Sequence, residues 1–546
     1  MTEPVADTPE ASGMGRASAV LAAGTVISRL LGFIRTLVLA AAIGTAAAGD
    51  AFAAGNQLPN NVYALIAGGV LSAVLVPQIV RAAAHHDGGE QYINRIVTLG
   101  MVIFGVVTVA ATLAAPVLIS LYVRSSDSGD GFTPAAIALA TAFAYWCLPQ
   151  IFFYALYSLL SEVLNARRIF GPFTWAPVVN NVVSIAGLAV FILLFGAEHA
   201  NSQVAAWDTG RIVLLGAVTT FAVAAQALVL FLFWSRAGLR FRPNFHWKGM
   251  GLATTGKAAG WLFGMVLITQ MAGLFQSNVA STASGRGASI FTLQNSWLIF
   301  MLPFSVIAVS IVTVYFTRMS GHGNSGDLAA IRSDLSEALR SIGLLIVFAT
   351  VALSIVAYPF ARLFPGKVSD MGNVILAFMP GLILYTVLYV IQRAFYSLGD
   401  YRTPFLLQCA QSVLFIVGAL ACLALPKEWT AVGIAAVTSI TIGIQAIAAL
   451  LLMRQRIGGI DGHHVLARHL QYVVLSLVSG VVGFGLLLLL GGLSNDGFAL
   501  SGRAPAIVSI VVIGLAMASV YLGLLALFRN PELASVTKVV TARFGR

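Results

Sequence analysis

The sequence predicts an all-α integral membrane protein with fourteen transmembrane helices. Of its 546 residues, 59% are hydrophobic and only 9% are charged, whereas roughly a quarter of the residues of a soluble domain are charged. The 31 basic and 20 acidic residues are too few to give several soluble domains a polar surface. The apolar residues form long unbroken blocks, which excludes a transmembrane β-barrel with its alternating segments of about ten residues.

The predicted helices correspond to apolar blocks of about 20 residues or more, which is long enough to cross a bilayer. In chain order they cover residues 17–43, 57–80, 96–122, 134–160, 173–196, 211–234, 257–282, 290–317, 336–360, 371–397, 404–425, 429–453, 469–492 and 504–528. Pro149 is expected to kink its helix without ending it. The first block is too long for the apolar region of a secretory signal and contains two arginines, so we interpret it as an uncleaved helix.

The basic residues predict the orientation of the chain. With an even number of helices both termini lie on one side, and 22 of the 31 basic residues fall on that side, against 7 on the other. Because lysine and arginine concentrate in cytoplasmic loops, both termini are expected in the cytoplasm. The net charge of +11 does not indicate nucleic-acid binding, since the basic residues are scattered between apolar blocks.

The two remaining basic residues, Arg29 and Arg35, lie inside the first predicted helix. At about 1.5 Å per residue, Arg29 lies about 18 Å from the start of that helix, near the middle of the membrane, and Arg35 about 9 Å further outward. The predicted helices contain Asp, Glu or His only at their ends, and an unpaired arginine that faces lipid costs several kcal/mol. We therefore expect both arginines to bind an anionic ligand. Two alternatives remain open: Arg35 snorkels to the outer interface, or Arg29 binds backbone carbonyls of a broken helix.

The surroundings of the two arginines support this expectation. Gly24, Ser28, Gly32 and Arg35 fall on one stripe of the helix. Small residues in such a stripe let another helix or a substrate approach closely.

The chain contains an internal repeat. Residues 15–35, GRASAVLAAGTVISRLLGFIR, resemble residues 256–276, GKAAGWLFGMVLITQMAGLFQ, and this alignment pairs Arg29 with Gln270 and Arg35 with Gln276. Further along, PQIFFYALYSLLSEVLNARRIFGPF resembles PGLILYTVLYVIQRAFYSLGDYRTPF, which pairs Tyr154 with Tyr385.

A repeat of six helices predicts two lobes of the same orientation, related by a pseudo-two-fold axis along the membrane normal, with the four paired side chains of the first helices facing one cavity. The last two helices have no counterpart. The predicted divisions are a cytoplasmic N-terminal tail (1–16), an N-lobe (17–235), a cytoplasmic linker (236–256), a C-lobe (257–455), the last helix pair (456–528) and a cytoplasmic C-terminal tail (529–546).

The residues favour a transporter over an enzyme or a channel. An enzyme would bring carboxylates, histidines or a nucleophile with its base into a site, and no such constellation is visible. The histidines at the helix ends are expected at the cytoplasmic surface and the cysteines are expected as small buried residues, not metal ligands: His85, His86, His463, His464, His469, Cys147, Cys409 and Cys422. A channel more often shows rings of charge or a filter loop, whereas two lobes around a cationic cavity suit alternating access for an anion.

Two stretches of the chain resemble a known family. SRLLGFIRTLVLAAAIGTAAAGDAFAAGNQLPNNVYALIAGGVLSAVLVPQIVR and RAFYSLGDYRTPF are similar to signatures of the MurJ (MviN) lipid II flippases, in the multidrug/oligosaccharidyl-lipid/polysaccharide exporter superfamily. The resemblance covers essentially the whole chain. It implies 14 helices, two lobes of six around a cationic cavity, and an extra helix pair that forms a groove for the lipid tail.

The resemblance also implies roles for individual residues. Arg29 and Arg35 match two family arginines, and Asp50 and Asn60 match an acidic position and the LPN position of the family. Two further family arginines are missing here, since they align with Tyr63 and with the neighbourhood of Leu298. Either the cavity is less basic or other side chains compensate for them, the candidates being Arg286, Gln294 and Asn295.

The activity implied is translocation of lipid II, the undecaprenyl-pyrophosphate-linked peptidoglycan precursor, from the cytoplasmic to the outer leaflet of the bacterial plasma membrane. Lipid II, membrane phospholipids and cell-wall synthesis proteins at the cytoplasmic face are the expected partners, and nucleic acid is not. No cofactor is expected, and a coupling cation such as sodium is left open. The alternatives are a membrane scaffold for cell-wall synthesis and a small-molecule exporter of the same superfamily. We expect an actinobacterial source; relatives there carry a cytoplasmic kinase-like domain after the core, and the sequence given ends in ARFGR without one.

Overall fold

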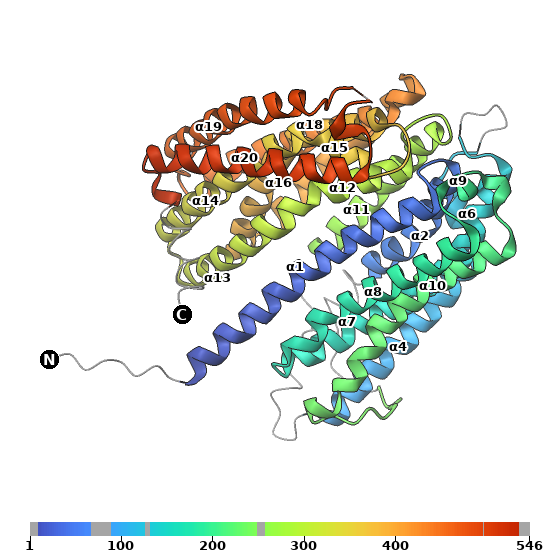
Figure 1. The fold of residues 1–546 in the computed structure, drawn as a ribbon. Coiled ribbons are helices and arrows are strands. Elements are labelled where there is room, and N and C mark those ends of the chain that lie inside the picture. Colours follow the sequence, from blue (N-terminus) through green and yellow to red (C-terminus); the bar gives the residue numbers. More distant parts are fainter. Residues whose placement is uncertain (1–8, 67–88, 126–130, 248–256, 495, 534–546) are drawn as a thin grey trace. The chain divides into compact units, whose positions relative to one another are not determined.

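The computed structural model describes residues 9–66, 89–125, 131–247, 257–494 and 496–533 (Figure 1). These residues are almost entirely helical and contain no β-strand. The helices are α1 (Pro9–Ile43), α2 (Ala47–Ile66), α4 (Glu90–Leu113), α5 (Ala115–Tyr122), α6 (Pro134–Cys147), α7 (Gln150–Ala166), α8 (Phe170–Phe195), α9 (Glu198–Asn201), α10 (Thr209–Leu228), α11 (Lys257–Ala280), α12 (Ile290–Pro303), α13 (Val309–Ser325), α14 (Leu328–Ile355), α15 (Ala357–Arg362), α16 (Val368–Ser397), α17 (Arg402–Ala421), α18 (Lys427–Arg456), α19 (Gly462–Leu489) and α20 (Arg503–Leu527).

The helices confirm the predicted all-α membrane fold. Thirteen helical stretches of the described residues are long and apolar enough to cross a membrane, and each overlaps one predicted block. The predicted helix at 57–80 begins in α2 and continues into residues 67–88, outside the described residues. The protein is therefore a multi-pass membrane protein.

Proline and capping residues explain where several helices break. At Pro149 the helix is interrupted but the span continues, as predicted: α6 ends at Cys147 and α7 begins at Gln150, while Leu148 and Pro149 keep right-handed helical dihedrals and residues Pro134–Ala166 form one candidate membrane span. Pro303 ends α12 and is followed by a π-helical turn at Phe304–Ala308 before α13 begins. The side chain of Asp327 accepts a hydrogen bond from the backbone N–H of Ala330 and so caps the start of α14.

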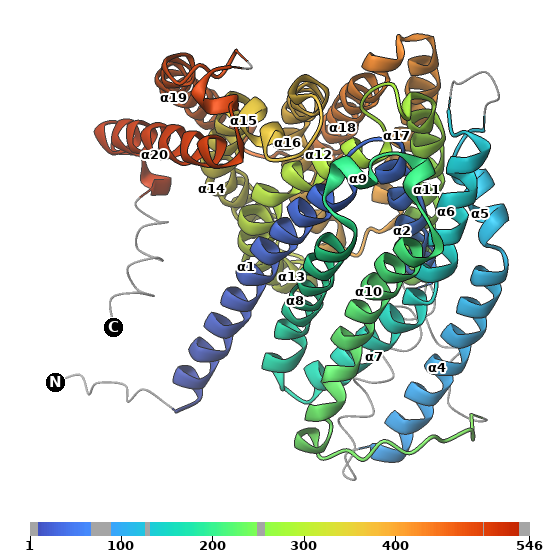
Figure 2. The ribbon, with the colours of Figure 1, turned by 45° about the vertical axis from the view of Figure 1, so that its right-hand side comes forward.

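The chain divides into two compact units, Met1–Gln270 and Met271–Arg546. In the first unit, α8 packs against α1 and α10, α2 against α6, and α4 against α7 (Figure 2). A buried cluster that includes Phe104, Leu159 and Trp234 joins α4, α7 and the short helical turn that follows α10. The predicted boundaries at 235 and 257 stay a prediction.

In the second unit, α16 lies between α14 and α18, and α17 packs against α18. The last two helices, α19 and α20, pack against each other, and α19 also packs against α14. The ring of Tyr521 in α20 stacks on Phe348 of α14, with 4.9 Å between ring centroids. The helix pair outside the predicted repeat is thus joined to the rest of the unit through α14.

The tyrosines paired by the predicted repeat have similar surroundings in their own units. Tyr154 of α7 contacts Tyr63 of α2, with 5.7 Å between ring centroids. Tyr385 of α16 contacts Phe304, directly after α12, with 4.7 Å between centroids. Since the second predicted helix of each copy begins in α2 and in α12, each tyrosine contacts the start of that helix in its own unit.

Candidate substrate-binding site

The two arginines of α1 differ in their surroundings. Arg29 is exposed, whereas Arg35 is half-buried and interacts electrostatically with Tyr154 of α7. Within the described part of the first unit, neither guanidinium forms a hydrogen bond or an ion pair. Their positions differ by six residues, which corresponds to about 9 Å along the helix axis and about 120° around it. They therefore leave α1 in different directions, and both keep donors for a ligand.

The stripe of small residues on α1 packs against α8. Of the two partners expected at this stripe, another helix or a substrate, the described residues show the helix. A Cβ atom added to Gly24 would lie 2.7 Å from Cγ2 of Thr174, and one added to Gly32 would lie 3.7 Å from Nδ2 of Asn181. Asn181 also donates a 2.9 Å hydrogen bond to the backbone carbonyl of Ser28. The stripe therefore holds α1 against α8 and sets the position of both arginines.

Next to Arg35 begins a chain of hydrogen-bonded side chains that joins three helices. The hydroxyl of Tyr154 donates to Oε1 of Gln150 at 3.3 Å. Gln150, only 1% exposed, donates through Nε2 to Asn56 of α2 at 3.4 Å and to Thr220 of α10 at 3.2 Å. Polar side chains buried among membrane helices are costly unless paired, so this network fixes the orientation of the tyrosine that faces Arg35.

The candidates on α2 occupy three different environments. Asp50 is completely buried in the first turn of the helix, where a carboxylate stabilises the helix N-terminus. Asn60 is exposed. Tyr63 is half-buried, and its hydroxyl lies 2.6 Å from Oγ of Ser158. Tyr154 therefore interacts with both Tyr63 and Arg35, whereas among the described residues of the first unit no hydrogen bond or ion pair joins Arg29 to this group.

The remaining candidates lie on α11, on α12 and between them. Gln270 and Gln276 are half-buried on α11, one at the end of the first unit and the other in the second unit. Arg286 is exposed in the connection that follows α11, and Gln294 is half-buried on α12. Asn295 is 7% exposed and donates to the carbonyl of Phe291 at 2.6 Å, so its amide is engaged within its own helix. Whether the side chains of α1 and α11 face one cavity stays a prediction.

Several amides buried between helices were not predicted as site residues. Asn180 of α8 donates to Gln226 of α10 at 2.7 Å. In the second unit, Gln445 of α18 donates to Gln408 of α17 at 3.2 Å, and Gln411 donates to Thr441 at 3.1 Å. A glutamine or asparagine inside an apolar block could have indicated them, because such side chains form hydrogen bonds between neighbouring membrane helices.

Comparisons with known proteins identify the family. The family model described as "Lipid II flippase MurJ" matches residues 39–494. The chain belongs to the MurJ family.

Members of the MurJ family from distant bacteria are similar to this chain over most of its length. The probable lipid II flippase MurJ of Haemophilus influenzae is 26% identical over 405 residues, which is 70% of this chain and 75% of the relative. That of Rhizobium meliloti is 25% identical over 403 residues, 71% of each chain.

Solved structures show the same fold. A lipid II flippase MurJ in an inward closed conformation matches with a TM-score of 0.68 at 18% identity, covering 92% of this chain and 98% of that chain. An inward-facing transporter of the multidrug resistance MATE family matches with a TM-score of 0.62 at 17% identity, covering 80% of this chain and 96% of that one. At these identities the likeness concerns the fold alone, and it places the MurJ family and the MATE transporters in one architecture.

Proposed function

We propose that this protein is a lipid flippase that moves lipid II from the cytoplasmic to the outer leaflet of the bacterial plasma membrane by alternating access, with both termini in the cytoplasm. Its membership of the MurJ family carries the proposal. Transport without covalent chemistry is the proposed activity, so the protein is not an enzyme. Lipid II is the substrate, membrane phospholipids surround it, and cell-wall synthesis proteins meet its cytoplasmic face.

The pyrophosphate of the precursor is proposed to bind Arg29 and Arg35. A guanidinium offers several N–H donors in a plane, which suits phosphate oxygens, and neither arginine is engaged in a hydrogen bond or ion pair with the described residues of its unit. Arg35 interacts electrostatically with Tyr154, whose hydroxyl donates a hydrogen bond to Gln150. We propose that this tyrosine donates to, or orients, the same headgroup. Gln270 and Gln276 are proposed to contact its sugar or peptide groups.

The membrane potential is the proposed energy source. Moving one elementary charge across a membrane is worth about 2.3 kcal/mol per 100 mV, and both the pyrophosphate and the arginines carry charge. A cation such as sodium, held by carbonyl and hydroxyl oxygens, is the alternative. The rate of transport measured with different cations separates the two proposals, because only the second makes transport depend on which cation is present.

The direct test is translocation of labelled lipid II in reconstituted vesicles, scored by exposure of the headgroup on the far leaflet. Arg29→Ala and Arg35→Ala are each expected to abolish translocation while the protein still inserts. Arg456→Ala, at an exposed position at the end of α18, is the matched control and is expected to behave as the parent does. Full activity of both α1 variants would refute the proposed headgroup contacts, and an inactive parent would refute the flippase itself.

A second candidate function, a scaffold that recruits partners, is favoured by one observation. Residues 239–247 run as an extended segment along α4, held by Glu90, Asn94 and Thr98, which follow one another at four-residue intervals on that helix. The backbone N–H of Arg240 donates to Glu90 at 2.9 Å, and that of Asn244 donates to Thr98 at 3.0 Å. Arg240 and Arg242 are exposed on this segment, and Arg236 is exposed in the turn just before it. Replacing these three arginines by glutamine would abolish a scaffold function but leave lipid II translocation intact.

A further inference from the structure

The chain turns back into the second unit after α20. Arg529 has a left-handed backbone conformation with φ of 47°, and the N–H of Asn530 donates to the carbonyl of Leu525 at 3.0 Å, which closes the end of the helix. Oδ1 of Asn530 then accepts a hydrogen bond from the N–H of Leu533 at 3.1 Å. Asparagine as cap followed by Pro531 is a strong helix start, and residues 531–533 are helical. We call residues 529–533 the C-terminal hook.

The hook inserts a carboxylate between two helices. Oε1 of Glu532 lies 3.4 Å from Nε of Arg340 in α14, and Oε2 lies 3.9 Å from Nε of Arg468 in α19. Glu532 is 7% exposed and Asn530 is 3% exposed. Without the carboxylate, two partly buried guanidinium groups would be left without this counter-charge, and breaking a buried pair in this way is strongly destabilising.

The site around Glu532 is polar well beyond the ion pairs. Tyr472 of α19 is completely buried and faces Asn530 and Glu532. The hydroxyl of Tyr472, Nδ2 of Asn530, Nε of Arg340 and Oε2 of Glu532 are all buried at this site. Leu533 packs beside this site on the apolar cluster of Leu344, Tyr472 and Tyr521.

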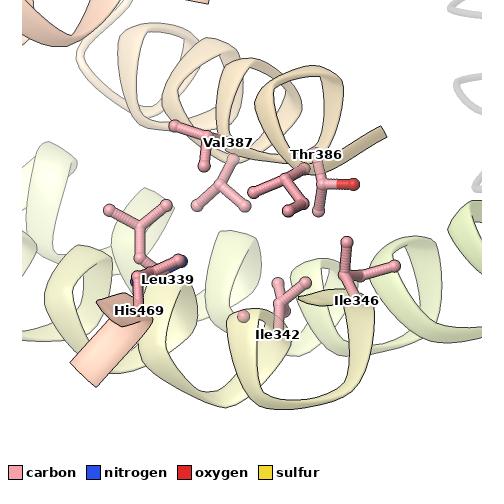
Figure 3. A pocket seen from close by; sticks show the side chains of 9 residues that line it. Leu339, Ile342, Ile346, Thr386, Val387 and His469 are labelled. Atoms are coloured by element: carbon pink, nitrogen blue, oxygen red, sulfur yellow. The ribbon is translucent and has the colours of Figure 1, made fainter. Parts of the chain in front are cut away.

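The helices that receive the hook fit closely to each other, whereas α14 fits less closely to α16. A Cβ atom on Gly343 of α14 would lie 2.5 Å from Nε2 of His469 in α19. The neighbouring α20 is also held against α14, because the hydroxyl of Tyr521 donates to the carbonyl of Leu344 at 2.7 Å. Between α14 and α16 lies a small pocket of about 10 Å³. Figure 3 shows Leu339, Ile342 and Ile346 of α14 on one side of this pocket, Thr386 and Val387 of α16 on the other, and His469 at its end.

We propose that α14 and α19 form a docking site for the C-terminal hook, with Glu532 as its recognition side chain. The docked hook holds the end of α20 against α14, a helix of the predicted repeat, so that the hook, α14, α19 and α20 move together. The site is therefore an intramolecular binding site for an acidic first turn of a helix.

The test is amide hydrogen exchange of the full chain in detergent, read by mass spectrometry on peptides that contain residues 529–533. Exchange of hydrogen-bonded amides reports the equilibrium of local opening. Glu532→Gln is expected to accelerate exchange in the hook about tenfold or more, because it removes the charge of a buried ion pair. Arg340→Gln is expected to release the hook as well. Glu428→Gln, at an exposed position in the first turn of α18, is the matched control and should leave exchange in the hook unchanged.

Equal exchange in Glu532→Gln and the parent would overturn the proposal, as would equal acceleration in Glu428→Gln. The melting temperature of each variant separates release of the hook from global unfolding. If Glu532→Gln does not fold, Glu532→Asp keeps the charge on a shorter side chain, and its exchange in the hook is expected to lie above that of the parent. Unchanged exchange in Glu532→Asp would then count against the docking site. None of these measurements depends on lipid II, so the docking site and the flippase function fail independently.

Discussion

Asn181 of α8 donates a 2.9 Å hydrogen bond to the backbone carbonyl of Ser28 in α1. Ser28 directly precedes Arg29, and Asn181 is only 6% exposed. The bond therefore fixes the height and rotation of α1 at the level of its first arginine. A contact of this kind explains how the position of Arg29 is set on a helix whose membrane-spanning part is mostly not buried.

Asn181→Leu is expected to weaken the contact between α1 and α8. Hydrogen bonds between membrane helices contribute about 0.6 kcal/mol on average and up to about 1.7 kcal/mol, so the melting temperature should fall slightly while lipid II translocation falls several-fold as Arg29 shifts. Both are measured on purified protein, the second in vesicles. The control is Val182→Leu, at the neighbouring position, where the side chain is 51% exposed. Equal translocation by the two variants would contradict the positioning role of Asn181.

A pair of glycines tests how tightly the first unit is packed. A Cβ atom on Gly55 of α2 would lie 2.8 Å from the backbone oxygen of Ala140 and 2.9 Å from Cβ of Phe143, whereas one on Gly105 of α4 would meet nothing within 4 Å. Gly55→Ala is expected to cost about 1–3 kcal/mol, the usual cost of overpacking. Gly105→Ala is expected to be neutral or slightly stabilising, since alanine favours a helix. Thermal unfolding monitored in detergent compares them, and a Gly55→Ala variant as stable as the parent would contradict the described approach of α2 to α6.

The amino-acid pattern predicted the membrane architecture because burial in lipid leaves a direct signature in composition. Thirteen of the predicted blocks overlap a helical stretch, and the position of Pro149 correctly marked a weak point in its helix. Whether this proline bends the helix or breaks it depends on the neighbouring turns, which the pattern does not specify. The π-helical turn after Pro303 results from local adjustment of the backbone, and the amino-acid pattern did not predict it either.

The candidate site was only partly predictable from the sequence. Arg29 and Arg35 stood out because charge is rare in an apolar block, but the surroundings of Arg35 depend on how α1 packs against α8 and how α7 packs against α2 and α8. The stripe from Gly24 to Gly32 predicted a close approach without showing that α8 makes it. Gln150 carried little signal, because a single amide inside an apolar block indicates a partner but does not identify it.

The tyrosines paired by the repeat provide a matched test of the network beside Arg35. The hydroxyl of Tyr154 donates to Gln150 at 3.3 Å and lies near Arg35. Tyr385 fills the corresponding place through ring contacts with Phe304 and Phe300. Tyr154→Phe is expected to lower the rate of lipid II translocation about threefold to tenfold, in line with about 1 kcal/mol for one hydrogen bond, whereas Tyr385→Phe keeps the ring contacts and most of the rate. The prediction is wrong if the second variant is impaired as much as the first.

Lysine substitutions separate the roles of the two arginines of α1. Arg35 is half-buried and interacts electrostatically with Tyr154, whereas Arg29 is exposed, so the side chain of Arg35 has less room to change its orientation than that of Arg29. A lysine keeps the charge but loses the paired donors. Arg35→Lys is therefore expected to reduce translocation about tenfold and Arg29→Lys about twofold, as a point charge is sufficient where the side chain is mobile. The initial rates of translocation of the two lysine variants are compared in vesicles with labelled lipid II at equal protein density. A stronger loss for Arg29→Lys than for Arg35→Lys would show that the oriented contact belongs to Arg29 instead.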